Sequence, residues 1–301
     1  MIGKLEMLIA LAKEQHFGRA AESLGITQPT LSNGIRQLED QLGVKLVQRG
    51  SRFGGLTPEG QRALEMARDI VGQARRLRDE MRFTREGLSG QLRLAVIPTA
   101  LTWAARIANR FTARHPNVRF SILSRSSQDV LAMIENLEAD AGISYLDNEP
   151  LGRVSSVPLY RETYALLCPP DHPLAGRATL GWTDLDGLRL CLLTPDMQNR
   201  RILDRNFIDA GLEARADIES NSTVVLVTNV LEGGWVTILP ADMARMLAGD
   251  KPIAVVPIGG GSRQPGVGLI APYQEPHTPV LQALLDEAQD LAERASARAP
   301  A

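Results

Sequence analysis

The apolar residues of the chain follow one pattern in the first 90 residues and another in the remainder. In the front part, apolar positions recur every three or four residues, which is the period of a helix that buries one face. From residue 91 onward, short apolar runs alternate with amphipathic stretches. Such alternation indicates a parallel sheet with helices packed on its faces. The pattern therefore predicts a helical front part and an α/β back part.

Two short helical patterns joined by a glycine occupy residues 18–42. The first, over residues 18–24, ends at Gly25, a residue that readily takes the left-handed conformation common at helix ends. Thr27 is suited to cap the second helix, and Pro29 falls in its first turn, where a missing N–H does no harm. The apolar residues of the second helix are spaced to form one buried stripe: Leu31, Ile35, Leu38 and Leu42.

The polar residues of this second helix are of the types that read DNA. A helix, a tight turn and a second helix that is polar in its first half form the helix-turn-helix arrangement, which enters the major groove. Amide side chains pair with adenine there, and arginine pairs with guanine. An amphipathic helix with a solvated face is the alternative for this segment alone. The candidate DNA contacts on the helix are Gln28, Pro29, Thr30, Ser32, Asn33 and Arg36.

A basic segment follows, over residues 45–52, and reads KLVQRGSR. It continues into FGGLT, which fits a two-stranded wing resting on phosphates, with Lys45, Arg49 and Arg52 as positioning contacts. Residues 1–90 hold 14 Lys and Arg against 11 Asp and Glu, whereas the remainder holds 19 against 24. Because residues 1–90 are net basic and the remainder is net acidic, we expect any polyanion to bind to residues 1–90. We expect a winged helix-turn-helix domain over residues 1–58.

A third helical pattern begins with Thr57 as its cap and Pro58 in its first turn, and extends to about residue 86. Its apolar residues alternate in steps of four and three, which is a heptad seam. The simplest partner for such a seam is a second copy of the chain, which would present two reading helices to DNA. Packing on the chain's own body is the alternative. The linker is expected over residues 59–88, with these seam residues: Ala63, Ala67, Ile70, Ala74, Leu77 and Met81.

The remaining residues, 89–301, read as two α/β lobes. Lobe I is expected over about residues 91–163 and 268–301, and lobe II over about residues 164–267. Each lobe contains a strand–helix–strand–helix–strand series, and the connecting segments read as strands that lead from one lobe to the other. The predicted strands of the two series cover residues 92–97, 118–124, 140–146, 188–194, 214–220 and 235–240.

Hydroxyl and amide side chains gather where these strands end and helices begin. Ligands of α/β sheets bind at such ends, where free helix N–H groups favour a small anion. Plain helix capping is the alternative for each position taken singly. Arg200 and Arg201 could pair an anion or lie on a solvated helix face. The candidate ligand contacts are Thr99, Ala100, Ser126, Ser127, Thr194, Gln198, Asn199 and Asn221.

The front motifs closely resemble the winged helix-turn-helix of LysR-type transcriptional regulators. The matching segments are AAESLGITQPTLSNGIRQLEDQLGVKLVQR and GLTPEG, and the layout of the back part is also similar. Two positions depart from the family pattern. Val47 stands where phenylalanine is usual, and Asn33-Gly34 stands where a basic residue and glutamine are common. A glycine inside a helix costs about 1 kcal/mol relative to alanine.

The resemblance implies a winged-helix DNA reader, a dimerising linker helix and an effector domain that resembles periplasmic binding proteins. It implies promoter DNA as a partner, self-association into homodimers or homotetramers, and RNA polymerase as a further candidate partner. A small-molecule effector is expected, with no cofactor and no metal. By the same resemblance, Thr99 and Ser127 align with positions that commonly touch effectors.

Other classes of protein find little support in the sequence. No apolar run approaches the roughly 18 residues of a membrane span, and the N-terminus lacks the features of a signal peptide, so we expect a cytoplasmic protein. The four histidines and two cysteines show no metal-ligand spacing. No nucleophile elbow, P-loop or dinucleotide fingerprint marks an enzyme. A thiol sensor using Cys168 and Cys191 is the alternative regulator, although both lie in apolar strand patterns typical of inert core residues.

Overall fold

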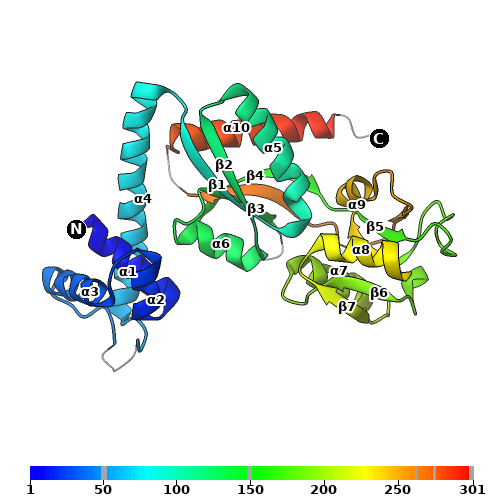
Figure 1. The fold of residues 1–301 in the computed structure, drawn as a ribbon, viewed down its shortest axis with the longest axis horizontal. Helices are drawn as coiled ribbons and strands as arrows, with labels where there is room; N and C mark the ends of the chain where they lie inside the picture. Colours follow the sequence, from blue (N-terminus) through cyan, green and yellow to red (C-terminus); the bar gives the residue numbers. More distant parts are fainter. Residues whose placement is uncertain (49–52, 148–150, 262, 274–275, 298–301) are drawn as a thin grey trace.

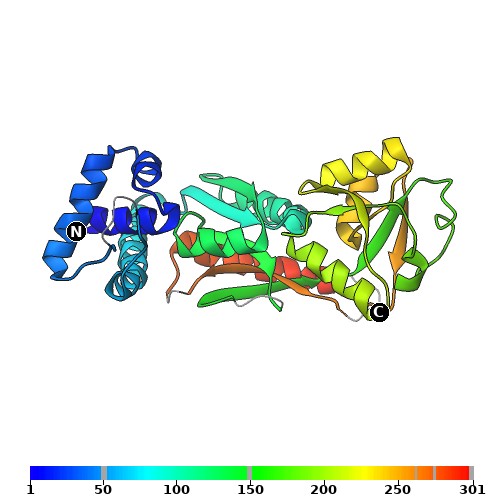
Figure 2. The same ribbon diagram turned by 90° about the horizontal axis from the view of Figure 1, so that it is seen from below.

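The computed structural model describes residues 1–48, 53–147, 151–261, 263–273 and 276–297 (Figure 1). Three bodies follow one another along the long axis of the molecule: a helical N-terminal domain, a first α/β lobe and a second α/β lobe (Figure 2). The long helix α4 (Pro58–Glu86) stands between the N-terminal domain and lobe I. The predicted fold is confirmed in this arrangement.

The N-terminal domain is built from α1 (Ile2–Glu14), α2 (Phe17–Ser23) and α3 (Gln28–Leu42). The turn between α2 and α3 has the predicted chemistry. Gly25 has a φ of 65°, and the Thr27 hydroxyl accepts a hydrogen bond from the backbone N–H of Thr30. The conformation of Gly25 and the Thr27 cap together set the turn between α2 and α3.

Gly34 lies in the middle of α3, on the side that faces α1. The residue is buried, and a Cβ at this position would lie 2.2 Å from the Met7 sulfur of α1. The atoms it would meet all belong to the flexible Met7 side chain, which would have to move to admit a larger residue. Gly34 has no side chain with which to reach DNA.

Helix α4 has two apolar faces, which corrects the predicted single seam. One face, with Leu64, Ala67 and Val71, is buried in the core of the N-terminal domain. Ala67 is fully buried within its own chain and so is not free to meet a partner, and Ala63 is partly buried against the same core. The predicted seam mixed residues of these two faces, because an alanine fits a buried face and a partner-facing face equally well.

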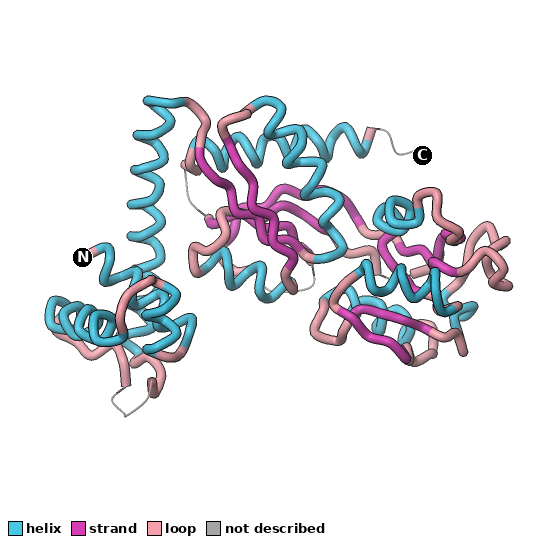
Figure 3. The backbone as a smooth tube through the Cα atoms, viewed as in Figure 1, coloured by secondary structure: helices cyan, strands magenta, loops and turns pink. Residues whose placement is uncertain are grey.

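Lobe I contains a five-stranded sheet in the order β2-β1-β3-β10-β4 (Figure 3). Strands β1, β2 and β3 are parallel, as predicted, and β10 pairs antiparallel with β3 and β4. Helices α5, α6 and α10 pack against the sheet. The elements are β1 (Gly90–Val96), a 3-10 turn η1 (Pro98–Ala100), α5 (Leu101–Arg114), β2 (Val118–Ser124), α6 (Ser127–Glu135), β3 (Ala141–Tyr145), β4 (Val154–Arg161), β10 (Gly266–Pro272) and α10 (Pro279–Ser296).

Lobe II contains two small sheets. Strands β8, β5 and β9 form an antiparallel sheet with β5 in the middle, and β6 and β7 form a parallel pair. Helix α9 follows β8 directly and is absent from the predicted series. The elements are β5 (Tyr164–Cys168), η2 (Trp182–Leu185), β6 (Leu190–Leu193), α7 (Gln198–Asp209), β7 (Ala216–Ser220), α8 (Thr223–Gly233), β8 (Thr237–Pro240), α9 (Ala241–Ala248) and β9 (Ala254–Ile258).

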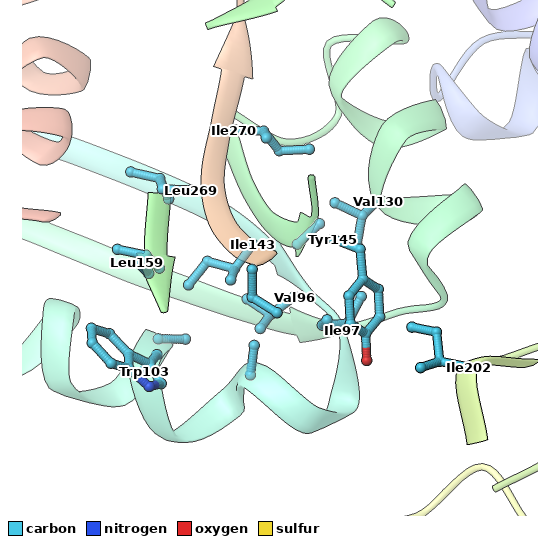
Figure 4. Packing of buried hydrophobic residues seen from close by; sticks show 14 of the residues in the cluster. Val96, Ile97, Trp103, Val130, Ile143, Tyr145, Leu159, Ile202, Leu269 and Ile270 are labelled. Atoms are coloured by element: carbon cyan, nitrogen blue, oxygen red, sulfur yellow. The ribbon is translucent and has the colours of Figure 1, made fainter. Parts of the chain in front are cut away.

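The core of lobe I continues to the edge of lobe II. Figure 4 shows Tyr145, at the end of β3, near Ile202 of α7, and the Tyr145 hydroxyl accepts a hydrogen bond from the Asn199 amide of α7 at 3.4 Å. Tyr145 and Ile202 belong to one buried cluster, so the two lobes are packed together at this point. Among the described residues, no helix combines the length and hydrophobicity that a membrane crossing needs.

Candidate DNA-binding and effector sites

Helix α3 presents a polar face away from the N-terminal core. Leu31, Ile35 and Leu38 are buried on its inner side. The predicted DNA contacts lie on the outer side and at the start of the helix. Ser32 is partly exposed, and the other five are exposed: Gln28, Pro29, Thr30, Asn33 and Arg36. Arg36 takes part in none of the ion pairs among the described residues, which leaves its guanidinium available to DNA.

The base of the wing is held by a buried carboxylate. Glu39 of α3 is only 7% exposed and accepts hydrogen bonds from the backbone N–H groups of Leu46 and Val47, at 2.9 and 3.3 Å. Its other oxygen pairs with the Lys45 ammonium at 2.8 Å. Burial acts to raise the pKa of Glu39, but these hydrogen bonds outweigh it and lower the pKa. Lys45 therefore neutralises Glu39, which reduces its value as a phosphate contact.

The wing itself is short. Val47 and Leu56 form an antiparallel bridge, and the backbone N–H of Gln48 donates to the Gly55 carbonyl at 3.0 Å. Arg49 and Arg52, two of the predicted phosphate contacts, lie outside the described residues. Their role stays a prediction.

The second apolar face of α4 is open to solvent. Leu77 is 63% exposed and Met81 57% exposed, and Ile70 lies on the same stripe. Met66, 64% exposed, extends the stripe toward the N-terminal domain, although it falls outside the predicted heptad seam. Ala74 is partly exposed. An apolar stripe of this length on a 29-residue helix indicates a surface for a partner.

A small cavity lies between the lobes at the carboxyl ends of β1, β3 and β6. Four of the eight predicted ligand contacts line it: Thr99, Ser127, Gln198 and Asn199. Its volume is about 10 Å³, close to that of a single water molecule. The lobes are thus closed on each other, and a larger ligand needs them to separate.

The other four predicted contacts do not line this cavity. Ala100 is buried in the core of lobe I. Ser126 caps α6, accepting from the Asp129 N–H at 3.2 Å, and Thr194 is partly buried at the end of β6. Asn221 is exposed. In this closed state, Ser126 acts as a helix cap, which was the alternative to a ligand contact at this position.

A buried carboxyl group lies beside the cavity. Glu162, on the segment that crosses from β4 to β5, is 1% exposed, and its Oε2 accepts hydrogen bonds from the hydroxyls of Tyr145 and Tyr164, at 3.1 and 3.0 Å. The Asn199 amide of α7 lies 3.5 Å from the same oxygen. Tyr145 is also 3.3 Å from the Thr99 hydroxyl. This Glu162 cluster joins both lobes to the crossing segment.

Burial raises the pKa of Glu162 to about 7, although the hydrogen bonds from the tyrosines act in the opposite direction. None of the ion pairs among the described residues involves this carboxyl group. Near neutral pH the group is therefore partly protonated and uncharged. In its protonated form, the carboxyl group beside the cavity does not repel an anion.

Both arginines near the cavity have partners. Arg200 is 7% exposed and donates to Asp204 at 2.8 Å and to Glu219 at 2.6 Å. Arg201 donates to Gln198 Oε1 at 2.7 Å. Arg200 thus holds α7 against β7, and it does not line the cavity.

The two cysteines are enclosed in lobe II. Cys168 and Cys191 are both 0% exposed, on β5 and β6. Burial raises the pKa of each thiol to about 11. Since the thiolate is the reactive form, both are poorly reactive at neutral pH. Neither residue lines the interlobe cavity.

Sequence reasoning missed Tyr145, Glu162 and Met197. Tyr145 ends β3, so the rule that ligands gather at strand ends could have found it. Glu162 offered one signal, a lone acid between two apolar strand segments. Met197 lines the cavity just before α7, in a stretch where the prediction names only the polar neighbours.

Comparisons with known proteins agree with this arrangement. Residues 2–61 match the family described as "Bacterial regulatory helix-turn-helix protein, lysR family", and residues 85–293 match "LysR substrate binding domain". The "DNA-binding transcriptional dual regulator OxyR" of Escherichia coli K12 is 32% identical over 241 residues, covering 80% of this chain and 79% of that protein. A "Hydrogen peroxide-inducible genes activator" of Dickeya chrysanthemi is 31% identical, with the same coverage of both chains.

Solved structures share the whole fold. A full-length OxyR variant from Pseudomonas aeruginosa superposes with a TM-score of 0.72 at 26% identity, covering 97% of this chain and 99% of that one. Full-length CbnR in complex with its target DNA has a TM-score of 0.58 at 23% identity, with the same coverage, which shows likeness of fold.

The helix-turn-helix, the linker helix and the two-lobed domain define a DNA-binding transcription regulator with an effector-binding domain, not an enzyme. More particularly, the chain belongs to the LysR family.

Proposed function

We propose that this regulator binds promoter DNA as a homodimer, or as a homotetramer of two such dimers, and acts on RNA polymerase from the promoter in the cytoplasm. Helix α3 reads base edges, the wing contacts phosphates, and the exposed stripe of α4 joins two copies. The observation that carries the proposal is the exposed polar face of α3, on which Arg36 lies outside the ion pairs of the described residues. The family's regulators bind DNA and self-associate, which supports it.

We further propose that the interlobe cavity, once opened, binds a small molecule with an anionic group, without a cofactor or metal. Helix α7 begins at this cavity with no side-chain cap, so its first N–H groups are available to an anion. The Thr99 and Ser127 hydroxyls add donors from lobe I, and the described residues hold no cluster of metal ligands.

Loss of the Gln28 side chain tests the reading helix. We expect Gln28→Ala to reduce discrimination between the promoter upstream of the protein's own gene and random duplex by about tenfold, because a bidentate amide–adenine pair is lost. Gel shifts on both duplexes across a salt series measure this. Gln61→Ala, at an exposed position of α4, is the matched control and should leave discrimination unchanged. Equal discrimination by the two variants would contradict the assignment of α3.

A charge on the α4 stripe tests the dimer. We expect Leu77→Glu to weaken self-association by about 2 kcal/mol or more, because a carboxylate would be buried between two apolar stripes. Sedimentation equilibrium measures the change. Ile208→Glu places the same charge at a similarly exposed apolar position on α7 and should leave association intact. Unaltered dimers in the Leu77 variant would place the interface elsewhere.

Peroxide sensing through a thiol is the second candidate, because several relatives carry "hydrogen peroxide-inducible" in their names. The buried positions and raised pKa values of Cys168 and Cys191 speak against it. Since neither thiol lines the interlobe cavity, we favour reversible binding of a small molecule.

A further inference from the structure

Helix α6 connects the interlobe cavity to the N-terminal domain. Its first residue, Ser127, is 1% exposed and lines the cavity. Its inner side is fixed to lobe I by Val130 and Ile134, which are buried in the core. The helix is nine residues long, or about 13 Å at 1.5 Å per residue. A short, well-packed helix of this kind moves as a rigid body.

The residues that follow α6 contact the linker and the N-terminal domain. Arg68 of α4 donates to the Asn136 side chain at 2.8 Å, and Arg75 of α4 donates to the Leu137 carbonyl. Lys13 of α1 pairs with Glu138 at 3.0 Å. These three contacts between Lys13, Arg68, Arg75 and residues 136–138 are called the α6 latch below.

Leu137 is the central residue of the latch. Its φ is 59°, a conformation that costs a leucine about 1 kcal/mol or more and persists only where the surroundings hold it. Its side chain packs against the core of the N-terminal domain, and its carbonyl also accepts from Arg93 of lobe I at 3.2 Å. The conformation of Leu137 is therefore held by contacts with both the N-terminal domain and lobe I.

We propose that α6 and its latch carry the state of the interlobe cavity to the DNA-binding domain. This inference rests on the proposed effector function of the cavity. Because the closed cavity has room for about one water, any larger ligand must separate its walls and contact Ser127, at the start of α6, on the lobe I side. Displacement of α6 moves residues 136–138 against α1 and α4, and so biases the position of the reading helix.

A substitution within the cavity serves as the probe, so that the test needs no identified effector. Ser127→Leu adds bulk at the start of α6 and forces the cavity open. We expect it to change promoter affinity by about fivefold or more, the usual scale of allosteric coupling. The substitution is then combined with Arg75→Ala, with Leu137→Gly and, as a matched control, with Arg78→Ala. Arg78 is exposed on α4 and takes part in none of the latch contacts.

In the Arg75→Ala and Leu137→Gly backgrounds, the effect of Ser127→Leu should fall below about twofold, whereas the Arg78→Ala background should keep it in full. Leu137→Gly suits the left-handed conformation, so loss of coupling there does not reflect backbone strain. Thermal melts and light scattering establish that each variant folds and associates normally.

Two results would overturn the inference in distinguishable ways. An unchanged Ser127→Leu effect in both latch backgrounds would remove the latch and leave the coupling of cavity to DNA in place. No effect of Ser127→Leu in any background would remove that coupling, and the latch with it.

Discussion

Replacement of Gly60 by alanine is expected to lower the free energy of unfolding of the winged domain by about 3 kcal/mol, the upper part of the range for an overpacked core. A Cβ at this position would lie 2.0 Å from the Leu46 carbonyl oxygen. That oxygen belongs to backbone and accepts from the Thr57 N–H at 2.9 Å, so it has little room to move. The start of α4 and the base of the wing would have to separate.

Urea unfolding of Gly60→Ala, followed by far-UV circular dichroism and by promoter binding, measures this loss. Gly3→Ala is the matched control, because Gly3 lies in α1 and a Cβ added there would meet no atom within 4 Å. Its replacement should raise stability by up to about 1 kcal/mol through helix propensity. Similar midpoints for the two variants would show that the backbone around Leu46 yields more easily than we expect.

The local signals in the sequence were sufficient for the N-terminal domain. Gly25, Thr27 and Pro58 fix the turn and the helix starts by short-range backbone chemistry, and each has the predicted role. The strands of both lobes were also readable, because each is either an apolar run, such as β6, or an alternation of apolar and polar residues, such as β7. Helix α9 was missed because it follows β8 at Pro240 without a capping side chain or an intervening turn.

Features that depend on distant residues could not be read in this way. Ala67 fits a heptad seam, but α1 covers it, and Met66 takes its place on the exposed face. Likewise, Glu162 has one local partner, Tyr164, two residues later, and a single tyrosine nearby in the sequence does not mark a buried acid. Its environment is created by Tyr145, 17 residues earlier, and Asn199, 37 residues later. Spacing along the chain predicts which residues share a helix face. It does not predict which other element of the fold packs against that face.

Replacement of Glu162 by glutamine should remove a large pH dependence of stability. The pKa of Glu162 is about 7 in the folded chain, against a reference value of 4.5. The unfolded chain therefore releases this proton first, and the free energy of unfolding falls as pH rises from about 4.5 through 7. At 1.36 kcal/mol per pH unit, the full loss is about 3 kcal/mol. Below about pH 4 the group is protonated in both states and contributes no such loss.

Chemical unfolding of the wild type and of Glu162→Gln at intervals from pH 5 to 8.5 measures the difference. The variant should gain most of the 3 kcal/mol relative to the wild type over this range, because a neutral amide can still accept from Tyr145 and Tyr164 without charge. Burial raises the pKa of each tyrosine well above 10, so neither titrates in the range.

Glu287→Gln is the matched control for a buried acid. This carboxylate is 3% exposed, but it pairs with Arg110 and Arg114, so its replacement leaves Arg110 without this partner and Arg114 with Asp290 alone, at 3.9 Å, and should lower stability. Parallel pH profiles for the wild type and Glu162→Gln would show that the carboxyl group is ionised throughout. In that case a negative charge would lie beside the cavity, and the proposal that the effector carries an anionic group would have to be abandoned.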